Sequence, residues 1–380
     1  MHIVSYNDCS EMDALEGAWE HLSKQELKYV PSFSELRHHL QASDLKFRVL
    51  VAIDNSQITA LACFIYHDTN KSYEIATRRL FSLPVKELSL FGSCVLGQPS
   101  ENVIRKFFQL IIAELRFDII NLGMIFVDTP LYNAVASLRH GVVACRVTRK
   151  IQPWWLIRLP RSFDEYFASL SGTTRRSFAR DGRHCEKEAP DFRVMQRPED
   201  VEKFLLDAEK ISRLTYQWGL GYGTRNDEHS QRRLTWLAKN GLLRCYILYL
   251  RGAPCAFGWG ELGHRTFVFE QTGYDPQYRK VSPGTALILR MIRDLIENTD
   301  CEVFDFKWGG DDGYKARFGN VSFSCVEIHL AQIYRPYSLL IVALHEMLNS
   351  FKKLVGSIIE HSAVKQRLRI VLRRYGIGTF

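Results

Sequence analysis

The chain has 380 residues, more than one small hydrophobic core organises, so about two domains are expected. Hydrophobic residues make up 46% of the chain and charged residues 24%, which excludes a disordered protein. The formal net charge of +8 favours an anionic partner such as a coenzyme, a nucleic acid, a phospholipid surface or an anionic glycan.

The cysteines and the hydropathy pattern indicate in which cellular compartment the protein is expected. Nine cysteines are scattered along the chain without a CxxC pair, so we expect buried thiols rather than disulfides or a zinc site. The histidines show no metal-binding spacing, and no metal is expected. The first residues lack the features of a signal peptide, and no apolar run approaches the roughly 18 residues that span a bilayer. These features predict a cytoplasmic protein, with peripheral attachment to the inner membrane face left open.

The first half of the chain alternates strand-like and helix-like segments. Two apolar runs, residues 47–52 and 58–66, flank a turn at residues 54–56 and predict a hairpin. The segments that follow indicate a strand, an amphipathic helix, a strand buried on both faces, a short helix and a strand: residues 88–96, 102–116, 119–127, 131–140 and 142–147.

The second half repeats this order. The hairpin, strand, helix, buried strand, short helix and last strand are predicted at residues 243–262, 266–271, 285–298, 303–306, 313–318 and 322–332. A strand at residues 152–160 passes from one copy to the next. We therefore predict two tandem α/β domains, residues 1–155 and 156–335, and a basic amphipathic helical tail over residues 336–380. Such a tail either packs on its own domain or lies on an anionic membrane surface.

A polar segment opens the second domain. Ser162 and Glu165 form a capping-box pattern and predict a helix start. In residues 173–187, four cations at spacings of four, three and four would form one stripe of a helix: Arg176, Arg180, Arg183 and Lys187. The stripe either grips phosphates or an acidic glycan, or is a solvated charged face, and the solvated face is the commoner case.

The residues Ser282, Pro283, Gly284 and Thr285 open an amphipathic helix after Arg279 and Lys280. The first turn of a helix has free N–H groups and a positive dipole end, so it can hold a pyrophosphate. Gly284 allows a ligand to approach the backbone. A plain helix cap is an equally good reading of this pattern.

Polar residues also lie at the ends of the two central strands. Asp305 stands between two phenylalanines, and a buried carboxylate needs a partner, for which Lys315 or Arg317 is the best choice. A structural ion pair is the favoured interpretation of Asp305, whereas Lys315 is the better candidate for a substrate contact. Glu270 ends the strand at residues 266–271, where a carboxylate beside a cleft could accept a proton, and Tyr274 and Tyr278 could orient or donate.

These motifs resemble a known family. The array of residues 274–276, 282–285, 304–306, 309–312 and 314–319 is similar to GNAT-type acyltransferases of the CelD-like cellulose-biosynthesis group, which is related to the tandem-GNAT Fem aminoacyltransferases. The resemblance implies mixed, mainly antiparallel sheets with helices on both sides and an acyl-CoA donor near residues 282–285. The chain departs from the family at Gly313, where the family has proline, and residues 279–284 match the GNAT pyrophosphate signature only loosely.

Together these observations predict an acyltransferase that moves an acyl group from acetyl-CoA or another acyl-CoA to an amine or hydroxyl of a sugar, glycan precursor or lipid-linked intermediate. The base and its helper would be Glu270 and Tyr278. The coenzyme would be held by Arg279, Ser282, Gly284 and Thr285. The acceptor would be bound by Asp305, Trp308, Asp312, Tyr314, Lys315 and Arg317. The first domain has no glycine at its helix start near residues 99–101, so it would supply acceptor surface only.

Two alternatives remain at this stage. One is a Fem-like aminoacyltransferase that takes its donor from charged tRNA, although a nucleic acid is the less favoured partner. The other is a non-catalytic scaffold, associated peripherally with a membrane or a polysaccharide synthesis or export complex.

Overall fold

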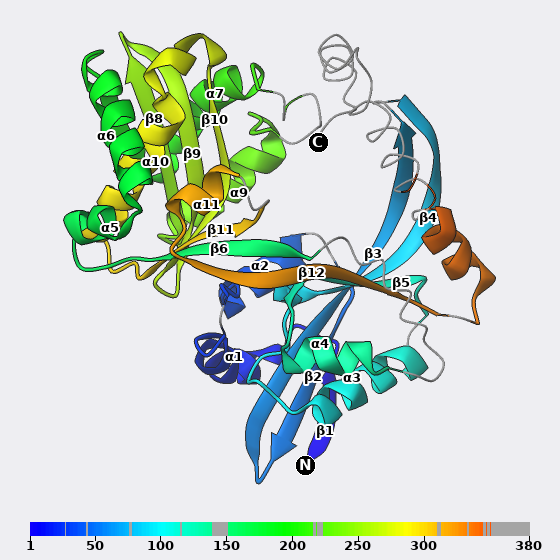
Figure 1. The fold of residues 1–380 in the computed structure, drawn as a ribbon. Helices are drawn as coiled ribbons and strands as arrows, with labels where there is room; N and C mark the ends of the chain where they lie inside the picture. Colours follow the sequence, from blue (N-terminus) through cyan, green and yellow to red (C-terminus); the bar gives the residue numbers. More distant parts are fainter. Residues whose placement is uncertain are drawn as a thin grey trace. The chain divides into compact units, whose positions relative to one another are not determined.

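The computed structural model divides into two compact units, which are described separately. It describes residues 1–26, 28–42, 45–75, 78–114, 116–138, 151–215, 218, 223–309, 313–332, 334–344, 347 and 350. Within these ranges unit 1 contains residues 1–152 and the segment from residue 323, and unit 2 contains residues 153–322. The elements of each unit are labelled in Figure 1.

Unit 1 is built on a mixed sheet. Its strands, in spatial order, are β1 (His2–Tyr6), β2 (Phe47–Asp54), β3 (Gln57–Ile75), β4 (Arg78–Leu90), β5 (Ile119–Phe126) and β12 (Val321–Ala331). Neighbouring strands run antiparallel except β4 and β5, which are parallel over three residue pairs from Glu87↔Ile119 to Ser89↔Asn121. The chain can make this parallel pair because a helix crosses over between the two strands.

Helices cover both faces of the unit 1 sheet. On one face α3 (Glu101–Glu114) and α4 (Pro130–Ala136) bury a core with strand residues such as Leu50 and Phe64. On the other face η1 (Met12–Leu15), α1 (Glu16–Ser23) and α2 (Phe33–Ala42) pack against Val49 and Cys63. The two cores use alternate residues of the same strands, as the side-chain period of two requires.

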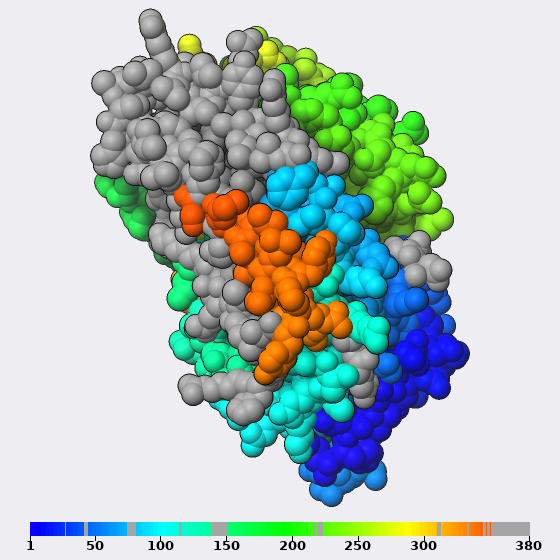
Figure 2. Space-filling model, turned by 90° about the vertical axis from the view of Figure 1, so that its right-hand side faces the viewer, coloured from blue at the N-terminus to red at the C-terminus, as the bar shows by residue number. Residues whose placement is uncertain are grey.

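A short C-terminal helix over residues 336–344 lies against the strands β3 and β4 in unit 1 (Figure 2). Ile341 is fully buried with Val85. The Tyr337 hydroxyl donates to the Pro84 carbonyl at 2.7 Å, and the Tyr73 hydroxyl donates to the Ile341 carbonyl at 3.2 Å. This start of the tail therefore packs on its own unit.

The strands of unit 2 also form a mixed arrangement. Its strands, in spatial order, are β6 (Gln152–Arg158), β11 (Val303–Trp308), β10 (Thr266–Tyr274), β9 (Ala253–Gly263), β8 (Leu243–Leu250) and β7 (Asp191–Met195). Again one pair, β10 with β11, is parallel, and the other neighbours are antiparallel. Each unit thus has one parallel pair inside a mainly antiparallel sheet.

The unit 2 sheet is also covered on both faces (Figure 1). On one face α5 (Phe163–Ser169), α6 (Gly172–Glu186) and α10 (Pro283–Asn298) pack against the core that includes Phe304 and Phe306. On the other face η3 (Pro198–Asp200), α7 (Val201–Ser212) and α9 (Glu228–Lys239) accompany a core with Phe257 and Trp259. The 3-10 helix η4 (Pro276–Val281) precedes α10, and α11 (Tyr314–Phe318) follows β11.

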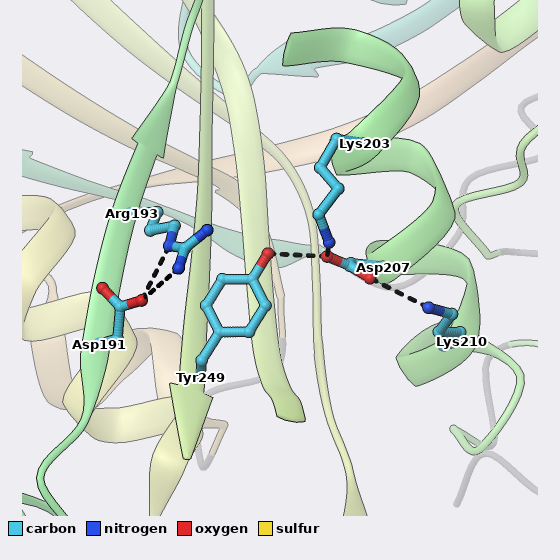
Figure 3. A network of polar contacts seen from close by, with 6 residues as sticks. All are labelled: Asp191, Arg193, Lys203, Asp207, Lys210 and Tyr249. Atoms are coloured by element: carbon cyan, nitrogen blue, oxygen red, sulfur yellow. Dashed lines mark hydrogen bonds and ion pairs between the residues drawn. The ribbon is translucent and has the colours of Figure 1, made fainter. Parts of the chain in front are cut away.

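A polar network ties α7 to the edge of this sheet (Figure 3). The buried Asp207 accepts a hydrogen bond from the Tyr249 hydroxyl at 2.7 Å and pairs with Lys203 and, at 3.2 Å, with Lys210. The Arg193 guanidinium lies 4.7 Å from the centre of the Tyr249 ring. Burial opposes ionisation, but the bonds from Lys203, Tyr249 and Lys210 lower the pKa of Asp207.

Most predicted elements are confirmed. The hairpin turn at Asn55 and Ser56 has positive φ at both residues, and the helices expected at residues 102–116, 173–187 and 285–298 are α3, α6 and α10. The Ser162 side chain accepts from the Glu165 amide as predicted, whereas the Glu165 carboxylate accepts from the amide of Arg161. Seven of the eight described cysteines are buried, and all eight are free.

The strand predicted at residues 322–332 is β12. It pairs antiparallel with β5, from Cys325↔Phe126 to Ala331↔Ile119. The strand predicted at residues 142–147, the end of the helix predicted at residues 131–140, and the tail from residue 351 lie outside the described residues. Within the described ranges every helix is too short or too polar to span a bilayer.

Candidate functional site

The candidate site lies where the parallel strands of unit 2 separate. β10 and β11 pair over Thr266↔Val303, Phe267↔Phe304 and Val268↔Asp305, and no further pair joins them among the described residues. Both strands nevertheless continue, to Tyr274 and Trp308. Ligand sites of α/β proteins occur where parallel strands diverge at their carboxyl ends.

A β-bulge falls on β10 at this point. The ladder with β9 shifts register between Phe269 and Gln271, so Glu270 is the extra residue and has no partner on β9. A bulge re-aims the side chain and releases the backbone groups of the extra residue from the ladder. The carboxylate of Glu270 and its main-chain groups are therefore presented at the divergence.

Glu270 pairs with a residue that sequence reasoning missed. The Lys307 ammonium donates to Glu270 Oε1 at 2.7 Å, and both side chains are largely buried, 27% exposed for Lys307 and 19% for Glu270. Glu270 Oε2 has no hydrogen bond to any residue that the structure describes. Lys307 has a left-handed backbone with φ of 60°, which a sequence pattern does not reveal.

Asp305 lies two residues before Lys307 on β11 and is 1% exposed. Its Oδ1 accepts from the Lys307 amide at 2.6 Å. Burial raises its pKa to about 6, against the lowering effects of Lys307, the Trp154 indole and the charge of Lys315. A carboxyl that titrates near neutrality at a strand divergence marks a candidate functional centre.

The expected pairing of Asp305 with Arg317 is wrong. Arg317 donates to Ser177 Oγ at 3.2 Å and lies 4.8 Å from the centre of the Phe178 ring, so its guanidinium is held by α6. Lys315 donates to the carbonyls of Phe306 and Trp308, each at 2.6 Å. These bonds stabilise the end of β11, and the charge of Lys315 lowers the pKa of Asp305.

The start of α10 forms the second part of the site. Ser282 has left-handed dihedral angles (φ 51°, ψ 49°), and its side chain makes no capping bond. Pro283 has no N–H, and the first helical bond of the turn is Ala286 N–H to the Ser282 carbonyl at 3.1 Å. The amides of Gly284 and Thr285 have no acceptor among the residues that the structure covers.

Gly284 has a close neighbour. A Cβ atom at this position would lie 3.3 Å from Cδ1 of Tyr274, whose ring is 39% exposed. The ring is thus one wall beside the free amides, and it can rotate away because much of it faces solvent. Glycine at this position keeps the helix start open.

The residues of η4 contribute charge and a hydroxyl. Arg279 and Lys280 are exposed and form no ion pair within the described ranges. Tyr278 packs half-buried against the α10 core, and its hydroxyl has no partner among described residues. η4 and α10 follow β10 directly, so these groups lie beyond the carboxyl end of the strand that carries Glu270.

Two exposed aromatic side chains flank the end of β11. Trp308 is 42% exposed, with its ring centre 5.7 Å from that of Trp154. Tyr314 is 41% exposed and stands edge-on to Phe306 at 6.2 Å. The remaining predicted acceptor residue, Asp312, lies outside the described residues. The site therefore combines unpartnered amides, cations, an acid and two exposed rings.

Comparison with known proteins identifies the fold of unit 2. Residues 172–316 match the family model described as an acetyltransferase (GNAT) domain. This range contains the strand divergence, the bulge and the start of α10. No curated protein sequence matches the chain.

Solved structures share the fold at low sequence identity. FemX is 11% identical with a TM-score of 0.58, over 90% of this chain and 100% of that one. The C-terminal DUF2156 domain of an Agrobacterium fabrum protein named for lysylphosphatidylglycerol synthesis is 10% identical with a TM-score of 0.50, over 88% and 97%. A conserved Bacteroides thetaiotaomicron protein of unknown function is 14% identical with a TM-score of 0.50, over 84% and 97%. The predicted class, tandem GNAT-like mixed α/β units, is confirmed.

Proposed function

We propose that unit 2 transfers an acyl group from acyl-CoA to an amine or hydroxyl of an acceptor. The observation that carries the proposal is the pair of unpartnered amides, Gly284 and Thr285, at the start of a helix beside two diverging parallel strands. This combination suits the diphosphate of a coenzyme, with its acyl arm running into the gap between the strands.

In this proposal the donor is held mainly by backbone. The Gly284 and Thr285 amides bind diphosphate oxygens, the α10 dipole adds to the attraction, and the Ser282 hydroxyl is available because it caps nothing. Arg279 and Lys280, exposed and free of ion pairs among described residues, balance the remaining charge. The Tyr274 ring moves aside or packs on the coenzyme.

The chemistry is direct attack in a ternary complex. Glu270, through Oε2 or a bound water, takes the proton of the attacking amine or hydroxyl, while Lys307 holds Oε1. The new C–N or C–O bond forms as the thioester C–S bond breaks, and the leaving thiolate takes a proton from the Tyr278 hydroxyl. In this proposal a main-chain N–H at the bulge donates to the oxyanion of the tetrahedral intermediate and stabilises it.

The acceptor is proposed to meet the exposed rings of Trp308 and Tyr314, which suit the flat apolar face of a sugar. Lys315 and Arg317 would bind an anionic part of it only by releasing their bonds to backbone and to Ser177. Asp305 is too buried to touch it and acts as a positioning residue for Lys307. A glycan precursor or lipid-linked sugar is the acceptor class that the CelD-like resemblance suggests, in a polysaccharide synthesis complex.

Thermal stabilisation by coenzyme A tests the donor. A ligand at about one hundred times its dissociation constant adds roughly 2.7 kcal/mol to the free energy of unfolding. We expect this gain for the wild-type chain and not for Gly284→Glu, because the new carboxylate lies where the diphosphate would bind. Two charge-assisted hydrogen bonds are worth roughly 3–6 kcal/mol, so binding should fall by at least about a hundredfold.

Gly172→Glu is the matched control. Gly172 also begins a helix, and a Cβ atom there would meet nothing within 4 Å. This variant should keep coenzyme affinity. Equal affinity in Gly284→Glu and wild type, with both folded, would remove the α10 site from the proposal.

A second candidate donor is an aminoacyl-tRNA, and one observation favours it. The cationic stripe is on a helix as predicted, and Arg176, Arg180, Arg183 and Lys187 are all exposed on or next to α6. Stabilisation by tRNA that weakens steeply with salt, without stabilisation by coenzyme A, would select this donor. If neither coenzyme A nor tRNA stabilises the chain, a non-catalytic scaffold is indicated.

A further inference from the structure

Unit 1 contains a cavity that the acyltransferase proposal does not use. It has a volume of about 340 Å³ and lies where the parallel strands β4 and β5 separate, next to the start of α3. Its apolar wall includes Val95, Ile104, Phe126 and Leu131. The sequence indicated only acceptor surface in this unit, because its helix start has no glycine.

A carboxylate with an unsatisfied oxygen lines this cavity. Glu26 Oε1 is buried and has no hydrogen-bond partner among described residues. Burial raises the pKa of Glu26, although the backbone amides of Gly97 and Gln98 and the charge of Lys28 act in the opposite direction. A buried acceptor without a donor costs stability, and a ligand that donates to it recovers that cost.

Lys28 is the cation of the cavity lining, and its ammonium group already makes hydrogen bonds. The Lys28 ammonium donates to the carbonyls of Ser93 at 2.8 Å and Met124 at 3.0 Å. Asp128 adds a second carboxylate to the lining, is exposed, and has no polar partner in the described part of the chain. The lining holds two carboxylates and one ammonium group, so it favours a cation over a phosphate, in contrast to the start of α10.

The backbone around the cavity adopts conformations that are energetically unfavourable. Three lining residues have left-handed φ values, 53° for Ser93, 49° for Gln98 and 64° for Asp128. Such residues cost about 1–3 kcal/mol each and collect at ligand sites. Gly123 allows this packing, since a Cβ atom there would lie 2.1 Å from Ser93 Oγ.

We infer that this cavity binds a small primary amine with an apolar body, whose ammonium group donates to Glu26 and faces Asp128 while its carbon chain lies on Ile104 and Phe126. All of its residues belong to unit 1, so the inference does not depend on the donor site of unit 2.

Three probes of equal length test the inference on the full chain: n-hexylamine, n-hexanol and hexanoate, titrated near neutral pH with ligand-observed NMR. Hexylammonium should bind saturably and tightest, hexanol more weakly, and hexanoate not at all. Glu26→Gln should weaken hexylammonium binding by about tenfold or more, the worth of a charged hydrogen bond. Glu101→Gln is the matched control, because Glu101 lies outside the cavity lining and pairs with Arg105 at 2.7 Å.

Several results would overturn the inference. Hexanoate binding as well as hexylammonium would exclude recognition by carboxylates, and this comparison needs no variant. Failure of all three probes to bind would exclude an amine site. An equal loss in Glu26→Gln and Glu101→Gln would show that surface charge, not the cavity, attracts the amine.

Discussion

Asp305→Asn should stabilise the protein at neutral pH. The side chain is 1% exposed, and burial raises its pKa from the ordinary 3.8 to about 6. At 1.36 kcal/mol per pH unit, this corresponds to about 3 kcal/mol of stability lost on ionisation. Asparagine removes the charge and keeps an oxygen that accepts from the Lys307 amide, so we expect a gain of about 1–3 kcal/mol at about pH 8.

The direction in which stability changes with pH follows from proton binding. Because the folded state holds the proton more tightly than the unfolded state, the contribution of Asp305 to stability is fully present below about pH 4 and is lost as pH rises through about 6. Asparagine has no such dependence, so variant and wild type should converge near pH 4 and separate above it. Urea unfolding across this range measures the difference, with the exposed Asp300→Asn as the control that should show no such separation.

Two outcomes would refute the reasoning. The first is that Asp305→Asn matches wild type in its pH dependence, which would mean that burial does not destabilise the ionised carboxyl. Alternatively it could be less stable at about pH 8, and the hydrogen bonds of the carboxylate would then outweigh its burial.

Two further sites give predictions of stability. Asp207→Ala should lower the free energy of unfolding by about 2–4 kcal/mol, because it leaves the buried Tyr249 hydroxyl without its acceptor. The double variant with Tyr249→Phe should lose about 1 kcal/mol less than the sum of the two single variants. Urea unfolding of the four proteins in this double-mutant cycle measures the coupling, and strict additivity would contradict the network. Gly260→Ala should prevent stable folding, because its Cβ atom would lie 2.1 Å from the Val268 carbonyl oxygen, whereas Gly172→Ala meets nothing and should be neutral or stabilising. Thermal melts compare the two alanine variants, and equal melting temperatures would be inconsistent with the close contact.

The elements that could be predicted are those with a clear apolar period. The apolar stripe of α10 could be predicted because Leu287, Met291 and Leu295 recur at helical spacing. All three side chains are fully buried. The far ends of β3 and β4 were missed. Residues 67–75 are mostly polar, and residues 78–87 contain Pro84 and charged residues at both ends, so neither segment gives a clear strand signal. The pairing of β12 with β5 depends on which strand edge is free, which is a property of the tertiary structure.

The site was only partly predictable, for the same physical reasons. Gly284 stood out because helix starts can be located from local patterns. Glu270 was singled out as the end of a strand, whereas β10 continues past it to Tyr274. The bulge at Glu270 and the left-handed turn of Lys307 depend on register and backbone dihedrals, so the ion pair between them was not foreseen. The cavity of unit 1 was also hidden, because residues from separate segments, such as Glu26 and Phe126, line it.

Hydrogen exchange at the Gly284 and Thr285 amides, with and without saturating coenzyme A, tests the donor site most directly. Both amides lack an acceptor among the described residues, so they should exchange quickly in the free protein and slow markedly when the diphosphate binds them. Unchanged exchange at these two amides, while coenzyme A binds or protects another part of the chain, would contradict the proposed site.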